Sequence, residues 1–195
     1  MVILIDGENL WFSLIELGEL EISDFKEFKK RLSEGKELVR IVYFRSVEME
    51  PEYPEKTLRT LRFLAYLEGL GYEIEKRPLS KGKLPKSEID PVIAVEICRS
   101  TIDKDVLTIT LLSGDGHFVP AVEFAKEKGK KVTVVSTAAS LSAKLKEVSD
   151  QWIDLEKVIE GITRKSEIEH KRKEALERLK QEGKKLNLST LKEFR

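Results

Sequence analysis

The sequence is short of cysteine, of net charge and of long apolar runs. Cys98 is the only cysteine, so it can form no internal disulfide, and we interpret it as a core residue. The 35 basic and 35 acidic residues cancel, which excludes a global field that draws the protein to nucleic acid or to an anionic membrane. A site for a polyanion must therefore come from local placement of charge.

No apolar stretch approaches the roughly 20 residues that span a bilayer. The chain begins directly with the apolar run VILID rather than with a signal-peptide pattern, so we expect a cytoplasmic protein without membrane contact. Asn and Gln total only four while charged residues make up 36% of the chain, a balance that resembles thermophile proteins. A length of 195 residues is enough for one domain and an appendage.

Short β-rich runs alternate with segments of helical period along most of the chain. Near-continuous apolar strands separated by helices predict an α/β fold with a mainly parallel central sheet covered on both faces. The predicted strands are 2–6, 38–46, 72–77, 106–113, 131–136 and 151–155. The predicted helices between them are 24–32, 55–71, 91–101, 117–129 and 138–149.

The pattern changes after about residue 158. We therefore place the domain at residues 1–158 and a charged helical C-terminal extension at 159–195. Ser166 and Glu169 have the spacing of a capping box, and a narrow apolar stripe follows on an otherwise charged helix. The stripe fits either a solvated helix docked on its own domain or on a partner, or a tail that contacts RNA or forms a homodimer.

Three carboxylates converge on one edge of the predicted sheet. In alternating β/α sheets, ligands gather at the carboxyl ends of the strands, where the following helices begin. Asp6 ends the first strand, and Asp115 follows the strand at 106–113. Asp90 precedes Pro91, which is typical of an N-cap followed by the first helical residue, and this places Asp90 at the same edge.

Each of these acids alone could be a helix cap or a turn residue. Clustered carboxylates repel one another, however, unless a cation or protons compensate their charge. Hard oxygen ligands with open coordination positions suit Mg²⁺ or Mn²⁺, and such ions support hydrolysis of phosphodiester bonds. The sequence therefore predicts that Asp6, Asp90 and Asp115 bind a divalent ion.

Three further residues are candidates for supporting roles at this edge. Asn9, one of only two asparagines, either caps the helix after Asp6 or holds a water or a phosphate oxygen. Ser113 either bonds within its turn or supports the metal ligands. Glu96 lies six positions beyond Asp90 and does not share its helical face, but it could reach inward from a neighbouring turn.

Candidate contacts with nucleic acid lie in a basic loop and in three aromatic residues. The loop RPLSKGKLPKSEID leads to Asp90, and its cations are either ordinary solvated charge or contacts to a phosphate backbone. These cations are Arg77, Lys81, Lys83 and Lys86. Trp11, Phe12 and Tyr53 could stack on bases, although we expect core packing for the first two.

The segments IDGENLW, KSEIDPVIAVEI and LLSGDGHFVPAVEFAKEKGKKVTVV, in this order, resemble the NYN domain family, PIN-like nucleases that include the LabA-type proteins. The resemblance covers roughly residues 1–155. It implies a Rossmann-like, three-layer PIN-like fold and a metal-dependent ribonuclease site. By the matching motifs it assigns functional positions to Asp6, Asn9, Asp90, Ser113 and Asp115, with Glu96 at a frequently acidic position.

The sequence departs from the family's pattern at His117, where members often carry a second acid two residues after SGD. Pro120 favours a helix start, so His117 should lie at the positive end of the helix dipole, which disfavours imidazolium. A neutral imidazole can bind a divalent ion, relay a proton or contact a phosphate, but it shifts the expected preference from Mg²⁺ to Mn²⁺. Alternatively, His117 is a surface or packing residue and three acids suffice.

The sequence thus predicts a metal-dependent endoribonuclease that acts on single-stranded or unpaired RNA, with Asp6, Asp90, Asp115 and His117 as catalytic residues. A nuclease-inactive RNA-binding or adaptor module of the same fold is the first alternative. A phosphatase or nucleotide-binding protein is another, although no P-loop, GxGxxG or DxDx(T/V) motif follows the first strand. DNA in place of RNA stays open, because the residues that would contact a 2′-hydroxyl cannot be located in the sequence.

Overall fold

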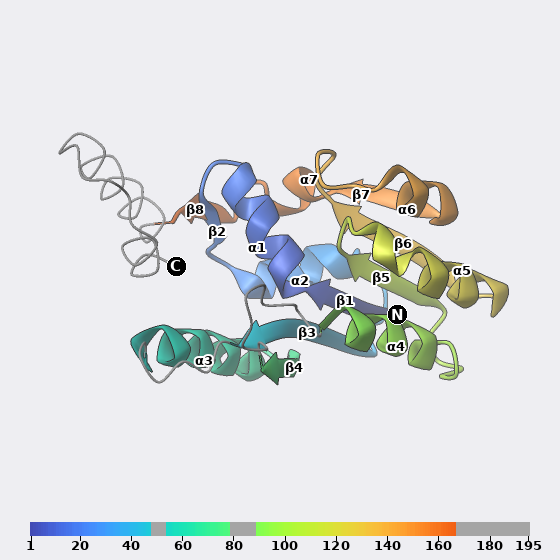
Figure 1. Ribbon diagram of the computed structural model, residues 1–195, viewed down its shortest axis with the longest axis horizontal. Coiled ribbons are helices and arrows are strands. Elements are labelled where there is room, and N and C mark those ends of the chain that lie inside the picture. Colours follow the sequence, from blue (N-terminus) through green and yellow to red (C-terminus); the bar gives the residue numbers. More distant parts are fainter. Residues whose placement is uncertain (48–53, 79–88, 167–195) are drawn as a thin grey trace, which may run out of the picture.

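The computed structural model describes residues 1–47, 54–78 and 89–166, which contain a six-stranded parallel sheet between two layers of helices (Figure 1). The strand order is β4-β3-β1-β5-β6-β7, and each neighbouring pair is parallel. The strands are β1 (Val2–Asp6), β3 (Arg40–Val47), β4 (Glu73–Pro78), β5 (Thr108–Leu112), β6 (Lys131–Ser136) and β7 (Gln151–Asp154). The predicted α/β fold with a mainly parallel sheet is confirmed.

The strands bury both faces because alternate residues point into two separate cores. In β1, Ile3 and Ile5 belong to one core, and Val2 and Leu4 belong to the other. The first core lies under α1 (Gly7–Glu16), α2 (Phe25–Ser33), α3 (Pro54–Gly69) and α7 (Leu155–Ile159). The second lies under α4 (Ile89–Ser100), α5 (Val119–Glu127) and α6 (Ala143–Val148). The result is the three-layer arrangement expected from the sequence.

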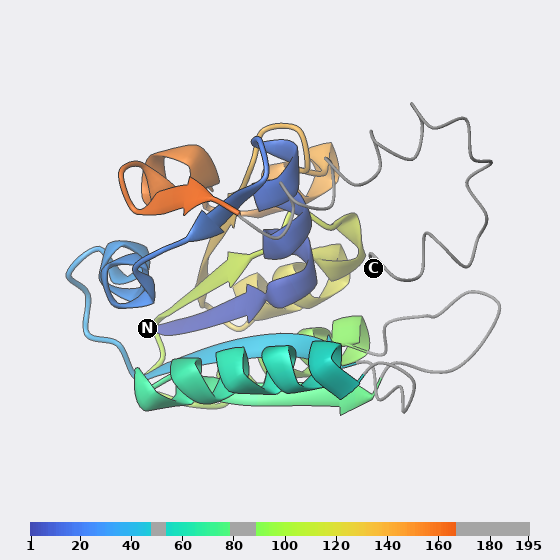
Figure 2. The same cartoon turned by 90° about the vertical axis from the view of Figure 1, so that its left-hand side faces the viewer.

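The carboxyl ends of the parallel strands share one edge of the sheet. In Figure 2 the arrows of β1 (dark blue) and β3 (light blue) point the same way, and α1 begins at the tip of β1. The strand order reverses between β1 and β5, since β3 and β4 extend the sheet on one side and β6 and β7 on the other. In such sheets the crevice at this switch point is the usual place for a ligand.

All five predicted helices begin at residues other than those expected, and the shifts of α4 and α6 have a clear structural reason. Asp90 is not the N-cap of α4 but lies in its first turn, because the helix already begins at Ile89. Pro91 still fits there, since the first backbone N–H groups of a helix have no partner within it. The helix predicted at 138–149 shortens to α6, because Thr137 and Ser140 hydrogen-bond to each other in the turn before it.

The expectation that Trp11 and Phe12 pack in the core is wrong. They are 37% and 58% exposed, respectively. Helix α1 buries Leu10, Ser13 and Leu14, which lie at i, i+3 and i+4, so the two aromatic residues lie on the opposite face of the helix.

A small second sheet joins the two ends of the domain. Strand β2 (Leu20–Ile22) pairs in antiparallel register with β8 (Thr163–Lys165). Ile159 and Ile162 are buried in the same core as α1 and α2. Ile159, Ile162 and strand β8 therefore pack with the domain.

The proposed helical tail from 167 onward lies outside the described residues, as does its suggested role in a homodimer. Among the helices of the described residues, none is long and apolar enough to cross a membrane.

The close packing of α1 on β3 gives a first prediction. A Cβ added at Gly7 would lie 2.6 Å from the carbonyl oxygen of Phe44 and 2.6 Å from the ring of Tyr43. Gly7→Ala should therefore lower the free energy of unfolding by about 1–3 kcal/mol, measured by urea denaturation.

The matched control is Gly69→Ala, since a Cβ at that position in α3 has no atom within 4 Å among the described residues. This control should be neutral or slightly stabilising. A Gly7→Ala protein as stable as the parent would contradict the close contact.

Candidate functional site

The side chain of Asp6 links three segments at the carboxyl edge of the sheet. Asp6 ends β1 and is the N-cap of α1, where its Oδ1 accepts hydrogen bonds from the backbone N–H groups of Glu8 (3.1 Å) and Asn9 (3.0 Å). Its Oδ2 accepts a hydrogen bond from the hydroxyl of Ser113 at 3.1 Å. Ser113 is fully buried just after β5, so Asp6 connects β1, α1 and the turn that follows β5.

The turn after β5 is held by two more hydrogen bonds. The Oδ1 atom of Asn9 accepts from the N–H of Gly114 at 3.2 Å, and the Oγ atom of Ser113 accepts from the N–H of Asp115 at 3.2 Å. Asn9 and Ser113, two of the three candidates for supporting roles, thus position the turn. Gly114 is required in this arrangement, because a Cβ there would lie 2.2 Å from the carbonyl oxygen of Ser140.

Asp115 and His117 interact within this turn. The N–H of His117 donates to Oδ1 of Asp115 at 2.8 Å, and Nδ1 of His117 lies 3.2 Å from Oδ2 of the same carboxylate. The His117 side chain is 82% exposed. His117 is therefore not a packing residue, and the alternative of a surface residue without a role in metal binding stays open.

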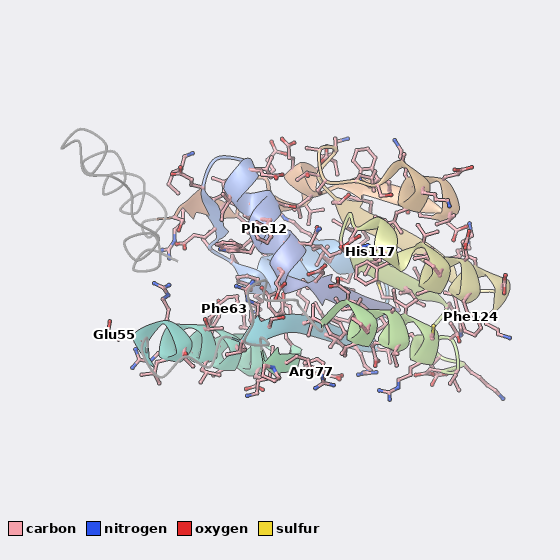
Figure 3. All side chains as sticks on the ribbon, in the orientation of Figure 1. Phe12, Glu55, Phe63, Arg77, His117 and Phe124 are labelled. Atoms are coloured by element: carbon pink, nitrogen blue, oxygen red, sulfur yellow. The ribbon has the colours of Figure 1, made fainter. Side chains whose placement is uncertain are left out.

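The structure brings together three of the four residues predicted to be catalytic. Asp90, Asp115 and His117 each offer one ligand atom, and these atoms all lie within 4.8 Å of one another. Asp90 comes from the first turn of α4, whereas Asp115 and His117 come from the turn between β5 and α5. His117 lies at the start of α5 in Figure 3. We call these three residues the surface trio.

Asp6 is not part of the surface trio but influences its charge. The pKa of Asp6 is raised to about 6, chiefly by burial and in smaller part by the negative charges of Asp90 and Glu8, against hydrogen bonds from Asn9 and Ser113 that lower it. Partial burial raises the pKa of Asp90 as well, followed by the charges of Asp115 and Glu8. The carboxylates therefore lie close enough to repel one another.

Glu8 is a member of this acidic group that the sequence reasoning missed. Its carboxylate accepts a hydrogen bond from the N–H of Ser46 at 3.2 Å, and its charge acts on both Asp6 and Asp90. The signal was present in IDGEN, where an acid follows Asp6 by two residues in the first turn of α1. Glu8 thus supplies negative charge beside the surface trio.

Glu96 does not join the site. Its Oε1 atom lies 2.7 Å from Nη1 of Arg40, which also binds Glu73 at 2.7 Å. Arg40 begins β3, so this ion-pair network lies at the amino edge of the sheet. The expected supporting role of Glu96 is wrong, because the path of α4 carries Glu96 toward the opposite edge from Asp90.

The basic loop is only partly described. Arg77 lies near the carboxyl end of β4 and forms an ion pair with Glu75 at 2.6 Å (Figure 3). Lys81, Lys83, Lys86 and the aromatic Tyr53 lie outside the described residues.

Comparison with known proteins shows the family to which this chain belongs. The NYN domain family matches residues 1–168. The chain belongs to the NYN domain family. NYN domains are PIN-like nucleases that generally depend on a divalent metal ion, so the carboxyl-edge acids lie in a domain of nuclease type.

Two curated relatives match parts of the NYN domain. An uncharacterized protein of Methanocaldococcus jannaschii is 30% identical over 73 residues, which cover 37% of this chain and 30% of that protein. The low amplitude and bright protein LabA of Synechococcus elongatus is 31% identical over 97 residues, which cover 46% of this chain and 51% of LabA. The matches thus span about half or less of each relative.

A solved structure supports the fold. The crystal structure of a protein of unknown function from Vibrio parahaemolyticus has a TM-score of 0.67 and 23% sequence identity, and the match covers 81% of this chain and 93% of that one. At this identity the similarity concerns the fold alone.

The raised pKa of Asp6 predicts a pH-dependent stability. The folded chain binds this proton more tightly than the unfolded chain does, so its stabilising contribution is complete below pH 3.8 and is lost as the pH rises through about 6. A pKa difference of about two units between the folded and the unfolded chain corresponds to about 3 kcal/mol of stability. Between pH 3.5 and 7.5 in EDTA, the free energy of unfolding of Asp6→Asn should therefore rise by up to about 3 kcal/mol relative to the parent.

The measurement is urea denaturation of both proteins across this pH range. The control is Asp24→Asn, which changes the exposed N-cap of α2. A difference between parent and Asp6→Asn that stays constant with pH would contradict the effect of burial on Asp6.

Proposed function

We propose that this NYN domain is a metal-dependent endoribonuclease that cleaves phosphodiester bonds in unpaired RNA. The observation that carries the proposal is the surface trio of Asp90, Asp115 and His117, next to buried Asp6, at the switch point of the sheet. Membership of a family of PIN-like nucleases supports the same conclusion.

The residues present fit a divalent cation. Two carboxylates and one imidazole nitrogen lie within 4.8 Å of one another. Burial raises the pKa of Asp90, and the negative charge of Asp115 adds to the effect, as expected where a cation would offset repulsion. We propose that Asp90 and Asp115 hold Mg²⁺ or Mn²⁺ together with His117, and that the negative charge of Asp6 adds to its attraction. Such an ion would neutralise charge on the scissile phosphate and promote ionisation of water.

The chain's own residues orient these groups. Nδ1 of His117 lies 3.2 Å from Oδ2 of Asp115. In the tautomer that donates from Nδ1 to this carboxylate, Nε2 is the atom that can contact an ion, a phosphate or a proton. Ser113 and Asn9 fix the backbone at Gly114 and Asp115. Arg77 and the loop cations Lys81, Lys83 and Lys86 are proposed to hold the RNA backbone.

The central test removes the acids of the surface trio one at a time. Asp90→Asn and Asp115→Asn should each lower the rate of RNA cleavage by about 100-fold or more, because each removes charge that attracts the ion. Cleavage is measured with a single-stranded RNA in Mg²⁺ and in Mn²⁺. Binding of Mn²⁺ by calorimetry should weaken in the same variants.

The matched control is Asp105→Asn, an exposed acid in the loop before β5 at the opposite edge. It should cleave like the parent. Full cleavage by Asp115→Asn would contradict the mechanism, whereas RNA binding by a parent that does not cleave in either metal ion would favour the adaptor alternative.

The role of His117 is tested by exchanging it for the family's acid. His117→Asp should raise the affinity for Mg²⁺ relative to Mn²⁺, because an anionic oxygen replaces a neutral nitrogen ligand. The readout is the concentration of each ion that gives half-maximal cleavage. If His117→Ala and the parent require the same concentrations of both ions, His117 is not a ligand.

A further inference from the structure

Two adjacent aromatic side chains are exposed on α1, the helix that begins directly after Asp6. Trp11 and Phe12 are 37% and 58% exposed, and their ring centroids lie 4.8 Å apart in an edge-on arrangement. Large exposed aromatic residues in pairs are costly on a surface that only water covers, and they are typical of binding sites. Figure 3 shows Phe12 on α1, the helix that Asp6 caps.

This aromatic pair continues the face of α1 that carries Glu8. Glu8, Trp11 and Phe12 lie at i, i+3 and i+4, so they are neighbours on one face of the helix. The negative charge of Glu8 raises the pKa of Asp6 and of Asp90, so the end of this helix face that carries Glu8 lies at the acidic site. The aromatic rings follow about one helical turn later, roughly 5.4 Å along the axis.

A cation connects the aromatic pair to the site. The guanidinium of Arg45, at the carboxyl end of β3, lies 5.8 Å from the ring centroid of Trp11. The same guanidinium donates to the carbonyl oxygen of Gly7 at 3.0 Å, next to Asp6. Arg45 thus contacts both the first residue of α1 and the ring of Trp11, and it brings positive charge to the aromatic pair.

An unpaired nucleotide matches this combination of groups. A base offers an aromatic face to stack on Trp11 or Phe12, and its phosphate offers negative charge to Arg45. A base within a duplex already stacks on its neighbours, so only an unpaired strand can supply such a face. Stacking on an aromatic ring does not distinguish between bases, because every base has an aromatic face.

We infer that Trp11, Phe12 and Arg45 form a stacking subsite for an unpaired base of the RNA strand whose phosphate lies at the surface trio. This inference rests on the proposed function and adds the residues that select single-stranded substrate. The subsite holds the strand beside the reacting phosphate, so its loss weakens binding of RNA without removing the acids.

The test compares two probes of equal charge. One is a fluorescently labelled oligouridylate of roughly eight nucleotides, and the other is the same strand with abasic sites, which keeps the phosphates and lacks the bases. Binding is measured by anisotropy in EDTA, so that cleavage does not compete. Trp11→Ala should weaken binding of the oligouridylate by about 5- to 150-fold, which is the effect of one stacked base, and should leave binding of the abasic strand unchanged.

Phe124→Ala is the matched control. Phe124 is also 37% exposed and also has a cation near its ring, with Lys128 at 5.3 Å, but it lies on α5 away from His117 (Figure 3). Phe124→Ala should bind both probes like the parent. Trp11→Phe keeps an aromatic face and should retain most of the affinity, which separates stacking from a fault in folding.

A spectroscopic readout tests the contact directly. In a Trp152→Phe protein, Trp11 is the only tryptophan of the chain, and its fluorescence should be quenched by the oligouridylate but not by the abasic strand. Equal affinity of Trp11→Ala and the parent for the oligouridylate would overturn the subsite, as would an equal loss on both probes.

Cleavage of RNA by the parent in Mn²⁺ distinguishes the two conclusions. If the parent cleaves and Trp11→Ala binds normally, the stacking subsite is wrong and the proposed function stands. If the parent neither binds nor cleaves RNA, both are wrong.

Discussion

The hydrogen bonds of the buried Asp6 carboxylate hold the functional edge of this NYN domain in place. They join the first turn of α1 to Ser113, which in turn accepts from the N–H of Asp115. The position of Asp115 decides where His117 lies, because both the backbone and the ring of His117 bind that carboxylate. The geometry of the surface trio therefore depends on a residue that is not one of its members.

Acidic side chains have different surroundings at the two edges of the sheet. At the amino edge, Glu73 and Glu96 share the guanidinium of Arg40, so their charge is offset within the fold. At the carboxyl edge, burial raises the pKa of Asp6 and of Asp90, and the negative charge of Glu8 adds to the effect on both. The chain thus keeps a local excess of negative charge at one place, even though its net charge is zero. A local excess of this kind attracts cations without making the whole surface acidic.

The sequence was sufficient to predict the sheet and the edge at which the acids meet. Strands of parallel sheets are apolar along their length, and their ends are set by chain order, so Asp6, Asp90 and Asp115 could be placed together without coordinates. Finer features depend on packing that periodicity does not contain. The exposure of Trp11 and Phe12 follows from which face of α1 meets the sheet. The ion pair of Glu96 with Arg40 depends on the path of α4 across the sheet, and the start of α4 at Ile89 could not be read from the periodicity either.

Strand β8 is the last described strand of the chain, and it pairs with β2, which is among the first elements. The register joins Leu20 to Lys165, across nearly the whole described chain. Contacts so distant in sequence form slowly, because closing a long loop costs entropy before the contacts can stabilise it. During synthesis the region around α1 and β2 must therefore wait for the end of the domain to leave the ribosome before its packing is complete.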